Sequence, residues 1–184
     1  RSPVTAADEA AEAVILERPT DPRSLLLLGR CLVPENRFEE ALGLFEQAIA
    51  AAPHLASVHF NKGKTLHDEG RIEDAKTAYE TALSCDPQFL DAILNLGVLL
   101  QETNQTKPAL QRFNTLIKLV PDHQKAHYNI GKCYHTQGRF DEALSTFKKA
   151  LDLNPNDHDA HFAIANTFND IKNHDDAIKH IKIA

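Results

Sequence analysis

Residues 129–155 read NIGKCYHTQGRFDEALSTFKKALDLNP, and this stretch predicts two short helices joined by a tight turn. Gly138 supplies a residue that tolerates the left-handed turn conformation. Asp141 and Glu142 follow in the expected first turn of the second helix, where negative charge is favourable. Pro155 ends that helix because it lacks a backbone N–H and restrains the preceding residue. The stretch is therefore interpreted as one helix–turn–helix unit.

The unit recurs with a period of 34 residues along the chain. At a proline background of about 5%, the proline register alone has a chance of about one in 10⁵. Three other positions keep the same phase, with an alanine, a large apolar residue and a small residue. The prolines are Pro19, Pro53, Pro87, Pro121 and Pro155; the alanines are Ala7, Ala41, Ala75, Ala109, Ala143 and Ala177; the large residues are Phe45, Tyr79, Phe113, Phe147 and Ile181, with Ala11 at this place in the first, partial repeat; the small residues are Gly29, Gly63, Gly97, Gly131 and Ala165.

Each repeated position has a mechanical reason. Glycine on the first helix and alanine on the second let two backbones approach, and a larger side chain would overpack the contact at a cost of about 1–3 kcal/mol. The large residues fill the gap between successive helix pairs, each contributing about 1.5–3 kcal/mol when fully buried. The turns between helices use residues that tolerate positive φ, namely Asn36, Gly70, Asn104 and Gly138.

A 34-residue period with these residues resembles the tetratricopeptide repeat family. The resemblance covers essentially the whole chain and implies an all-α solenoid, an α–α superhelix of antiparallel helix pairs. We expect a single array over residues 1–184. Its parts would be the second helix of a partial repeat (6–18), four full repeats (22–55, 56–89, 90–123 and 124–157) and a truncated last repeat (158–184).

The sequence departs from the family pattern at three places. Lys62 precedes Gly63, where the family usually has a bulky residue. Pro34 falls near the end of a first helix and is expected to shorten or kink it. Pro108 falls early in a second helix, with Thr106 as the expected cap of that helix.

Composition narrows the class of partner and the compartment. The formal net charge of −6 argues against a general nucleic-acid binder, which would normally be basic. No apolar run approaches the roughly 20 residues that span a bilayer, so we predict no membrane association. Three cysteines at wide spacings favour a reducing compartment, and we predict a cytoplasmic location. The chain opens at Arg1 and contains no methionine, which we interpret as an excised fragment of a longer protein.

In tetratricopeptide proteins the first helices line a concave groove. Offsets of four, three and four residues return to one face of a helix and select the groove-facing stripe. The stripe is Arg23, Leu27, Arg30 and Pro34; Ser57, Asn61, Lys64 and Asp68; Asp91, Asn95, Val98 and Glu102; Lys125, Asn129, Lys132 and Thr136; Asp159, Ala163, Asn166 and Asp170.

Two sets of stripe residues are candidate peptide ligands. Asn61, Asn95 and Asn129 occupy one repeat position, and their amides offer a donor and an acceptor to the backbone of an extended peptide. A similar asparagine ladder lines the groove of the O-GlcNAc transferase repeat domain. The alternative is that these asparagines only support the repeat. The cationic set suggests an acidic or carboxylate-bearing ligand and comprises Lys64, Lys125, Lys132 and Arg30.

Ten histidines raise a metal hypothesis. His123 with His127, and His158 with His161, have spacings that chelate a metal on one helix face. However, His59, His127 and His161 share a repeat position that packs within the helix pair, and no carboxylate or cysteine recurs beside them. The sequence also lacks the common nucleotide-binding and hydrolase motifs. We therefore predict no metal, no cofactor and no catalytic activity.

These observations predict a protein–protein interaction module that binds an extended peptide or partner helix in the concave groove. A second hypothesis is the substrate-recruiting arm of a larger enzyme, such as a glycosyltransferase. A third is a self-assembling scaffold, because no helix follows the last one and Ile178 and Ile181 should leave an apolar side uncovered.

Overall fold

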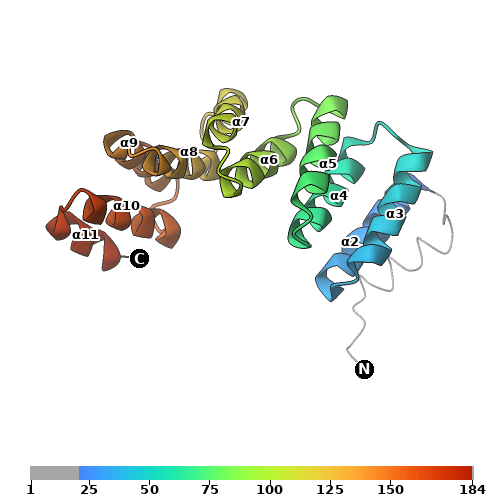
Figure 1. Ribbon diagram of the computed structural model, residues 1–184, viewed down its shortest axis with the longest axis horizontal. Coiled ribbons are helices and arrows are strands. Elements are labelled where there is room, and N and C mark those ends of the chain that lie inside the picture. The colour runs from blue at the N-terminus through green and yellow to red at the C-terminus, as the bar shows by residue number, and fades with distance from the viewer. Residues whose placement is uncertain (1–20, 184) are drawn as a thin grey trace. The chain divides into compact units, whose positions relative to one another are not determined.

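The computed structural model describes residues 21–183. In this part of the chain, helices are joined by short turns and there is no β-strand (Figure 1). The expected helix over 6–18 lies outside the described residues. The helices are α2 (Pro22–Leu32), the 3₁₀ helix η1 (Val33–Glu35), α3 (Phe38–Ala51), α4 (Ala56–Asp68), α5 (Ile72–Cys85), α6 (Leu90–Glu102), α7 (Thr106–Leu119), α8 (Gln124–Thr136), α9 (Phe140–Leu153), α10 (His158–Asp170) and α11 (His174–Ile181).

Helix lengths and starts follow the 34-residue period. First helices α4, α6, α8 and α10 have 13 residues each, and second helices α3, α5, α7 and α9 have 14 each. Pro34 shortens the first helix of its pair as predicted, since α2 has 11 residues and the chain continues as η1. The predicted all-α fold of antiparallel helix pairs is confirmed. None of the described helices is long and apolar enough to cross a membrane.

The described chain divides after Asn95 into two compact units, and each is considered by itself. In the unit up to Asn95, α2 pairs with α3, α4 pairs with α5, and α3 packs on α4. In the unit from Leu96 onward, α7 packs on α8, α8 pairs with α9, α9 packs on α10, and α10 pairs with α11.

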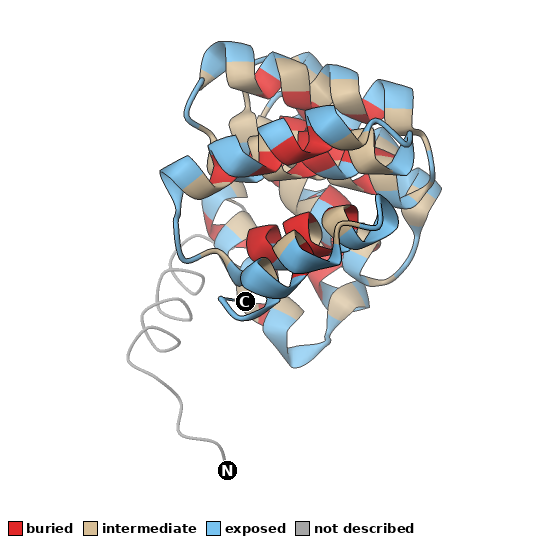
Figure 2. Ribbon diagram, turned by 90° about the vertical axis from the view of Figure 1, so that its left-hand side faces the viewer, coloured by how far each residue is buried: buried red, intermediate tan, exposed pale blue. Residues whose placement is uncertain are grey.

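In four helix pairs, from α2–α3 to α8–α9, a glycine of the first helix packs against an aromatic ring of the second, whereas α10–α11 has Ala165 and Ile181 at these positions. A Cβ added at Gly131 would lie 2.5 Å from Cδ1 of Phe147, and one at Gly29 would lie 2.4 Å from Cε1 of Phe45. The same relation holds for Gly63 with Tyr79 and for Gly97 with Phe113, and all four rings are 0–1% exposed. Figure 2 marks the buried positions in red along the helices. Phe147 and its counterparts therefore fill space within their own pair, which explains why the first helix needs glycine there.

The turn residues adopt the predicted conformation. Gly70 and Gly138 have φ values of 78° and 72°, and Asn36 and Asn104 both have φ of 59°. Lys172, with φ of 61°, takes this place in the last pair and was not predicted. The capping prediction for Thr106 is wrong: α7 begins at Thr106 itself, its N-cap is Gln105, and no side chain caps it.

Candidate functional site

The asparagine row is engaged with its own helices. The Nδ2 group of Asn61 donates to the carbonyl of Ser57 (2.7 Å), and that of Asn95 to the carbonyl of Asp91 (2.8 Å). In the second unit, Asn129 donates in the same way to the carbonyl of Lys125 (2.9 Å) and is buried. Each asparagine side chain thus donates one amide proton to the backbone carbonyl four residues before it in the same helix. The hydrogen bonds of the described residues leave each Oδ1 available as an acceptor.

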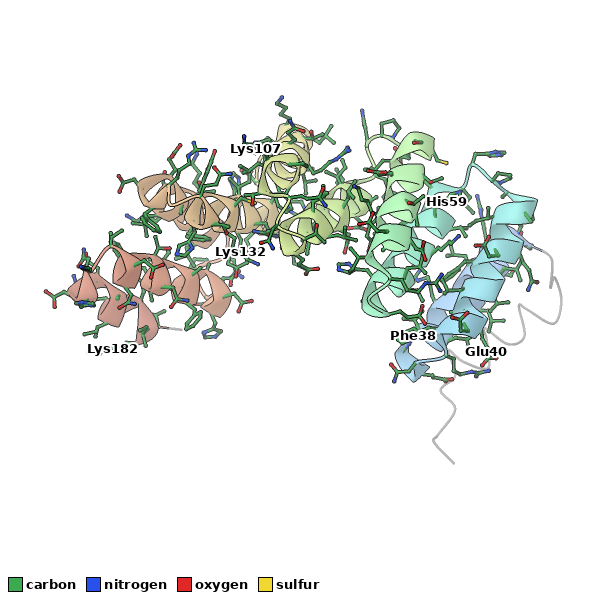
Figure 3. The ribbon with its side chains drawn as sticks, viewed as in Figure 1. Phe38, Glu40, His59, Lys107, Lys132 and Lys182 are labelled. Carbon is green, nitrogen blue, oxygen red and sulfur yellow. The ribbon has the colours of Figure 1, made fainter. Side chains whose placement is uncertain are left out.

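The four cationic candidates are all exposed, and they come from three helices. Arg30 is on α2 and Lys64 on α4, while Lys125 and Lys132 are both on α8. Only α8 therefore carries two of them. Lys132 is labelled in Figure 3. Its ammonium lies 5.7 Å from the centre of the Tyr128 ring, a distance that suits a cation–π contact.

A pocket of about 270 Å³ opens between α8 and α10, next to Lys132. Four predicted stripe residues line it, together with three aromatic rings and a histidine. Phe162 on α10 is 57% exposed, which is unusual for a side chain of this size. The lining residues are Tyr128, Lys132, His135, Thr136, Phe147, Phe162, Ala163 and Asn166.

The walls of this pocket are fixed by contacts within the second unit. The Tyr128 ring packs against Phe147, with 5.8 Å between ring centres. Burial raises the pKa of the Tyr128 hydroxyl, and nearby Asp159 and Asp157 raise it further. At the far side, Nε2 of His135 lies 3.0 Å from Oδ2 of Asp170 and joins α8 to α10. The pocket therefore has an aromatic interior with one cation, Lys132, in its lining, while the carboxylates of Asp157, Asp159 and Asp170 lie close to lining residues.

The sequence analysis missed Tyr128 and Phe162, the two rings that give the pocket its character. A signal for them existed, since they stand 34 residues apart at a repeat position that also holds Phe60, Leu26 and Leu94. This position lies beside the stripe rather than on it. In the first unit, Phe60 turns to other rings, with its centre 5.1 Å from Phe89 and 5.9 Å from Tyr79.

Four family models, all described as tetratricopeptide repeat, match the chain in overlapping segments. The matched residues are 4–56, 35–89, 66–133, 125–157 and 146–179. Together they account for nearly all of the sequence. This chain belongs to the tetratricopeptide repeat family.

Solved tetratricopeptide structures share its fold at low sequence identity. YrrB, described as a tetratricopeptide repeat protein with an unusual peptide-binding site, is 24% identical with a TM-score of 0.75, and the match covers 95% of this chain and 90% of YrrB. MamA from Desulfovibrio magneticus is 20% identical with a TM-score of 0.81, over 88% of this chain and 92% of MamA. PilF from Pseudomonas aeruginosa is 21% identical with a TM-score of 0.80, and the match covers 91% of this chain and 76% of PilF. No curated protein matches the chain in sequence.

Three histidines of this tetratricopeptide array form hydrogen bonds to the turn before their repeat. Nε2 of His59 lies 2.7 Å from the carbonyl of Pro53, and the histidines of two later repeats make the same bond six residues back, His127 to Pro121 (2.7 Å) and His161 to Pro155 (3.0 Å). Because a carbonyl only accepts, Nε2 must carry the proton. These histidines therefore tie each turn to the helix that follows it, which is more specific than the packing role predicted.

The described residues contain no group of three or more histidine, cysteine, aspartate or glutamate side chains placed to hold a metal. Cys133 is fully buried, and burial raises the pKa of its thiol to about 11. Such a thiol is a poor nucleophile at neutral pH because it is almost wholly protonated. This residue therefore belongs to the core of the second unit.

Proposed function

We propose that this tetratricopeptide chain is a protein–protein interaction module whose α8–α10 pocket accepts an apolar or aromatic side chain of an extended peptide. The observation that carries the proposal is an exposed phenylalanine, Phe162, beside a hollow of about 270 Å³ that the predicted groove stripe lines. Aromatic anchors in such pockets commonly dominate the energy of an interface.

Polar groups around the pocket supply the contacts that an extended peptide backbone needs. Asn166 and Thr136 line the pocket, and the free Oδ1 of Asn129 lies one helical turn from Lys132 on the same face of α8. Lys132 and Lys125 would attract a carboxylate of the ligand, while Asp159 and Asp157 near Tyr128 oppose a strongly acidic peptide. A ligand with one large apolar side chain and few charges therefore suits the site best.

The test starts from a phage-displayed library of random peptides panned on the purified chain, followed by calorimetric titration of the enriched peptides. Phe162→Ala should weaken their binding by about tenfold or more, since removing an anchoring ring commonly costs over 2 kcal/mol. Leu153→Ala is the matched control, because Leu153 is 40% exposed on α9 but does not line the pocket. Failure to enrich peptides, or equal binding to both variants, would contradict the proposal.

The asparagine row is tested separately from the pocket. Changing Asn61, Asn95 and Asn129 to alanine removes three bonds worth about 0.5–1.5 kcal/mol each and gains roughly 0.5 kcal/mol of helix propensity each. We therefore expect a small change in melting temperature, together with weaker binding of any peptide that uses the row. A large loss of stability with unchanged peptide affinity would show that the asparagines only support the repeat.

The same proposal places the module in the cytoplasm, where the free thiols of Cys31, Cys85 and Cys133 would stay reduced. A role as the recruiting arm of a larger enzyme remains a second hypothesis. It uses the same pocket and would differ only in what the ligand is delivered to.

A further inference from the structure

One charged residue breaks the repeat pattern in the first unit. Lys62 stands at a position that is otherwise aliphatic, occupied by Leu28, Leu96, Ile130 and Ile164. In the second unit these residues are buried, with Ile130 3% and Ile164 0% exposed. The side chain of Lys62 is 28% exposed, and its Nζ lies 2.5 Å from Oε1 of Glu46 on α3. A charged side chain thus occupies a position that normally holds an aliphatic core residue.

Around Lys62 the second helices α3 and α5 leave a cleft of about 600 Å³, with α4 as its floor. Small side chains line part of both walls. A Cβ added at Gly43 on α3 would meet no atom within 4 Å, and Thr77 and Ala78 face it from α5. From Glu39 to Ile49 the α3 wall extends about 15 Å at 1.5 Å per residue, enough for several ligand residues.

The charge of the cleft favours a cationic occupant. Three carboxylates line it and remain well exposed, with side-chain exposures of 83% for Glu39, 57% for Glu46 and 59% for Asp74. Its two cations, Lys62 and Arg71, are both paired with these carboxylates. The unit as a whole is also acidic, since residues 21–95 contain 12 aspartates and glutamates against 7 lysines and arginines.

We propose that this cleft is a second interaction surface, which binds a cationic segment of a partner protein between α3 and α5. Arginine or lysine side chains of that segment would pair with Glu39 and Asp74 at the rim. The Lys62–Glu46 pair keeps the floor polar, so that the cleft is not closed by an aliphatic side chain. This surface uses second helices and shares no residue with the α8–α10 pocket. The cleft is therefore a separate site from the peptide pocket.

The probe is a blocked, alanine-based helical peptide of about 15 residues with evenly spaced arginines, titrated into the ¹⁵N-labelled chain and followed by NMR. We expect saturable shifts in the amides of α3 and α5. Gly43→Gln places a side chain in the cleft and should weaken binding by about tenfold or more, whereas Gly43→Ala should bind as the wild type does. Both changes raise helix propensity at an exposed position, so neither should unfold the chain.

A second pair of variants separates the cleft from general charge. Glu39→Lys should weaken binding, whereas Glu73→Lys, which changes the net charge equally on the exposed face of α5 outside the cleft, should not. Absence of saturable shifts, equal effects of both charge reversals, or binding unaffected by Gly43→Gln would overturn the proposal. Phe162→Ala should leave this binding unchanged, so the outcome does not depend on the peptide pocket of the second unit.

Discussion

Replacing Gly131 by alanine tests the glycine–aromatic contact that sets the spacing of each helix pair. The new Cβ would lie 2.5 Å from both Cδ1 and Cε1 of Phe147, whereas ordinary contacts are 3.4–4 Å. The ring would have to move by about 1 Å, yet Phe147 is 1% exposed and cannot swing into solvent. Overpacking of this kind costs about 1–3 kcal/mol.

The matched control is Gly43→Ala, on the second helix α3. Both substitutions gain about 1 kcal/mol of helix propensity, but a Cβ at Gly43 meets no atom within 4 Å. Gly43→Ala should therefore stabilise the chain by about 1 kcal/mol. The difference between the two variants isolates the contact with Phe147, because the propensity gain cancels. At about 2–4 °C per kcal/mol, a 2 kcal/mol contact separates their melting temperatures by roughly 4–8 °C.

The assay is thermal unfolding followed by circular dichroism, with native-state hydrogen exchange of the amides in α8 and α9. Exchange is needed because repeat arrays often unfold in parts, and a single midpoint then mixes them. Gly131→Ala should speed exchange in α8 and α9 specifically. If both variants raise the melting temperature equally, the close approach of Gly131 to Phe147 is refuted, and the glycine register has another cause.

Three further predictions concern charge, pH and assembly. Lys62→Leu restores the aliphatic pattern and should raise the free energy of unfolding by about 1 kcal/mol in urea titrations; a loss instead would make the Lys62–Glu46 pair structural. Burial, followed by His161 and Lys148, lowers the pKa of His180, with Lys179 also lowering it and Asp176 raising it. The stability of α11 should therefore be complete above the unfolded pKa of about 6.5 and fall as the pH drops through the folded pKa, a trend that His180→Phe should flatten in melting curves. Ile178 and Ile181 are 51% and 57% exposed as predicted, so light scattering should show mass rising with concentration for the wild type and a constant monomer mass for the double serine variant.

The repeat could be predicted closely because its residues act locally. Gly70 and Gly138 are selected by a left-handed turn, and Pro34 ends the α-helix that precedes it, so these effects are visible in a short window of sequence. Lys172 was missed because a lysine at positive φ has no compositional signal. The fifth turn adopts that conformation because both neighbouring helices require it.

The sites were harder to predict because they depend on which side chains of neighbouring helices face one another in the folded chain. Helical spacing selected Lys132, which does line the pocket, but the pocket arises from Tyr128 and Phe162, which the same spacing puts beside the stripe. Their exposure depends on the neighbouring helix rather than on their own. For the asparagines, helical spacing alone could not predict that Asn129 would donate to the carbonyl of Lys125. Side-chain amides have several partners within reach, and only geometry selects one.

Each candidate surface contains one residue that costs stability: Lys62 by its charge at an aliphatic position, and Phe162 by its exposure. A repeat that only had to fold would keep an aliphatic residue at position 62, as four of the five repeats do, and would not leave a ring as exposed as Phe162. Each departure costs stability, because Lys62 partly buries a charge and Phe162 leaves apolar area in water. Such local violations without a structural gain are expected at functional sites. If Lys62→Leu stabilises the chain while Gly43→Gln weakens binding of the cationic peptide, the two measurements will show that the same cleft loses stability through Lys62 and binds the peptide.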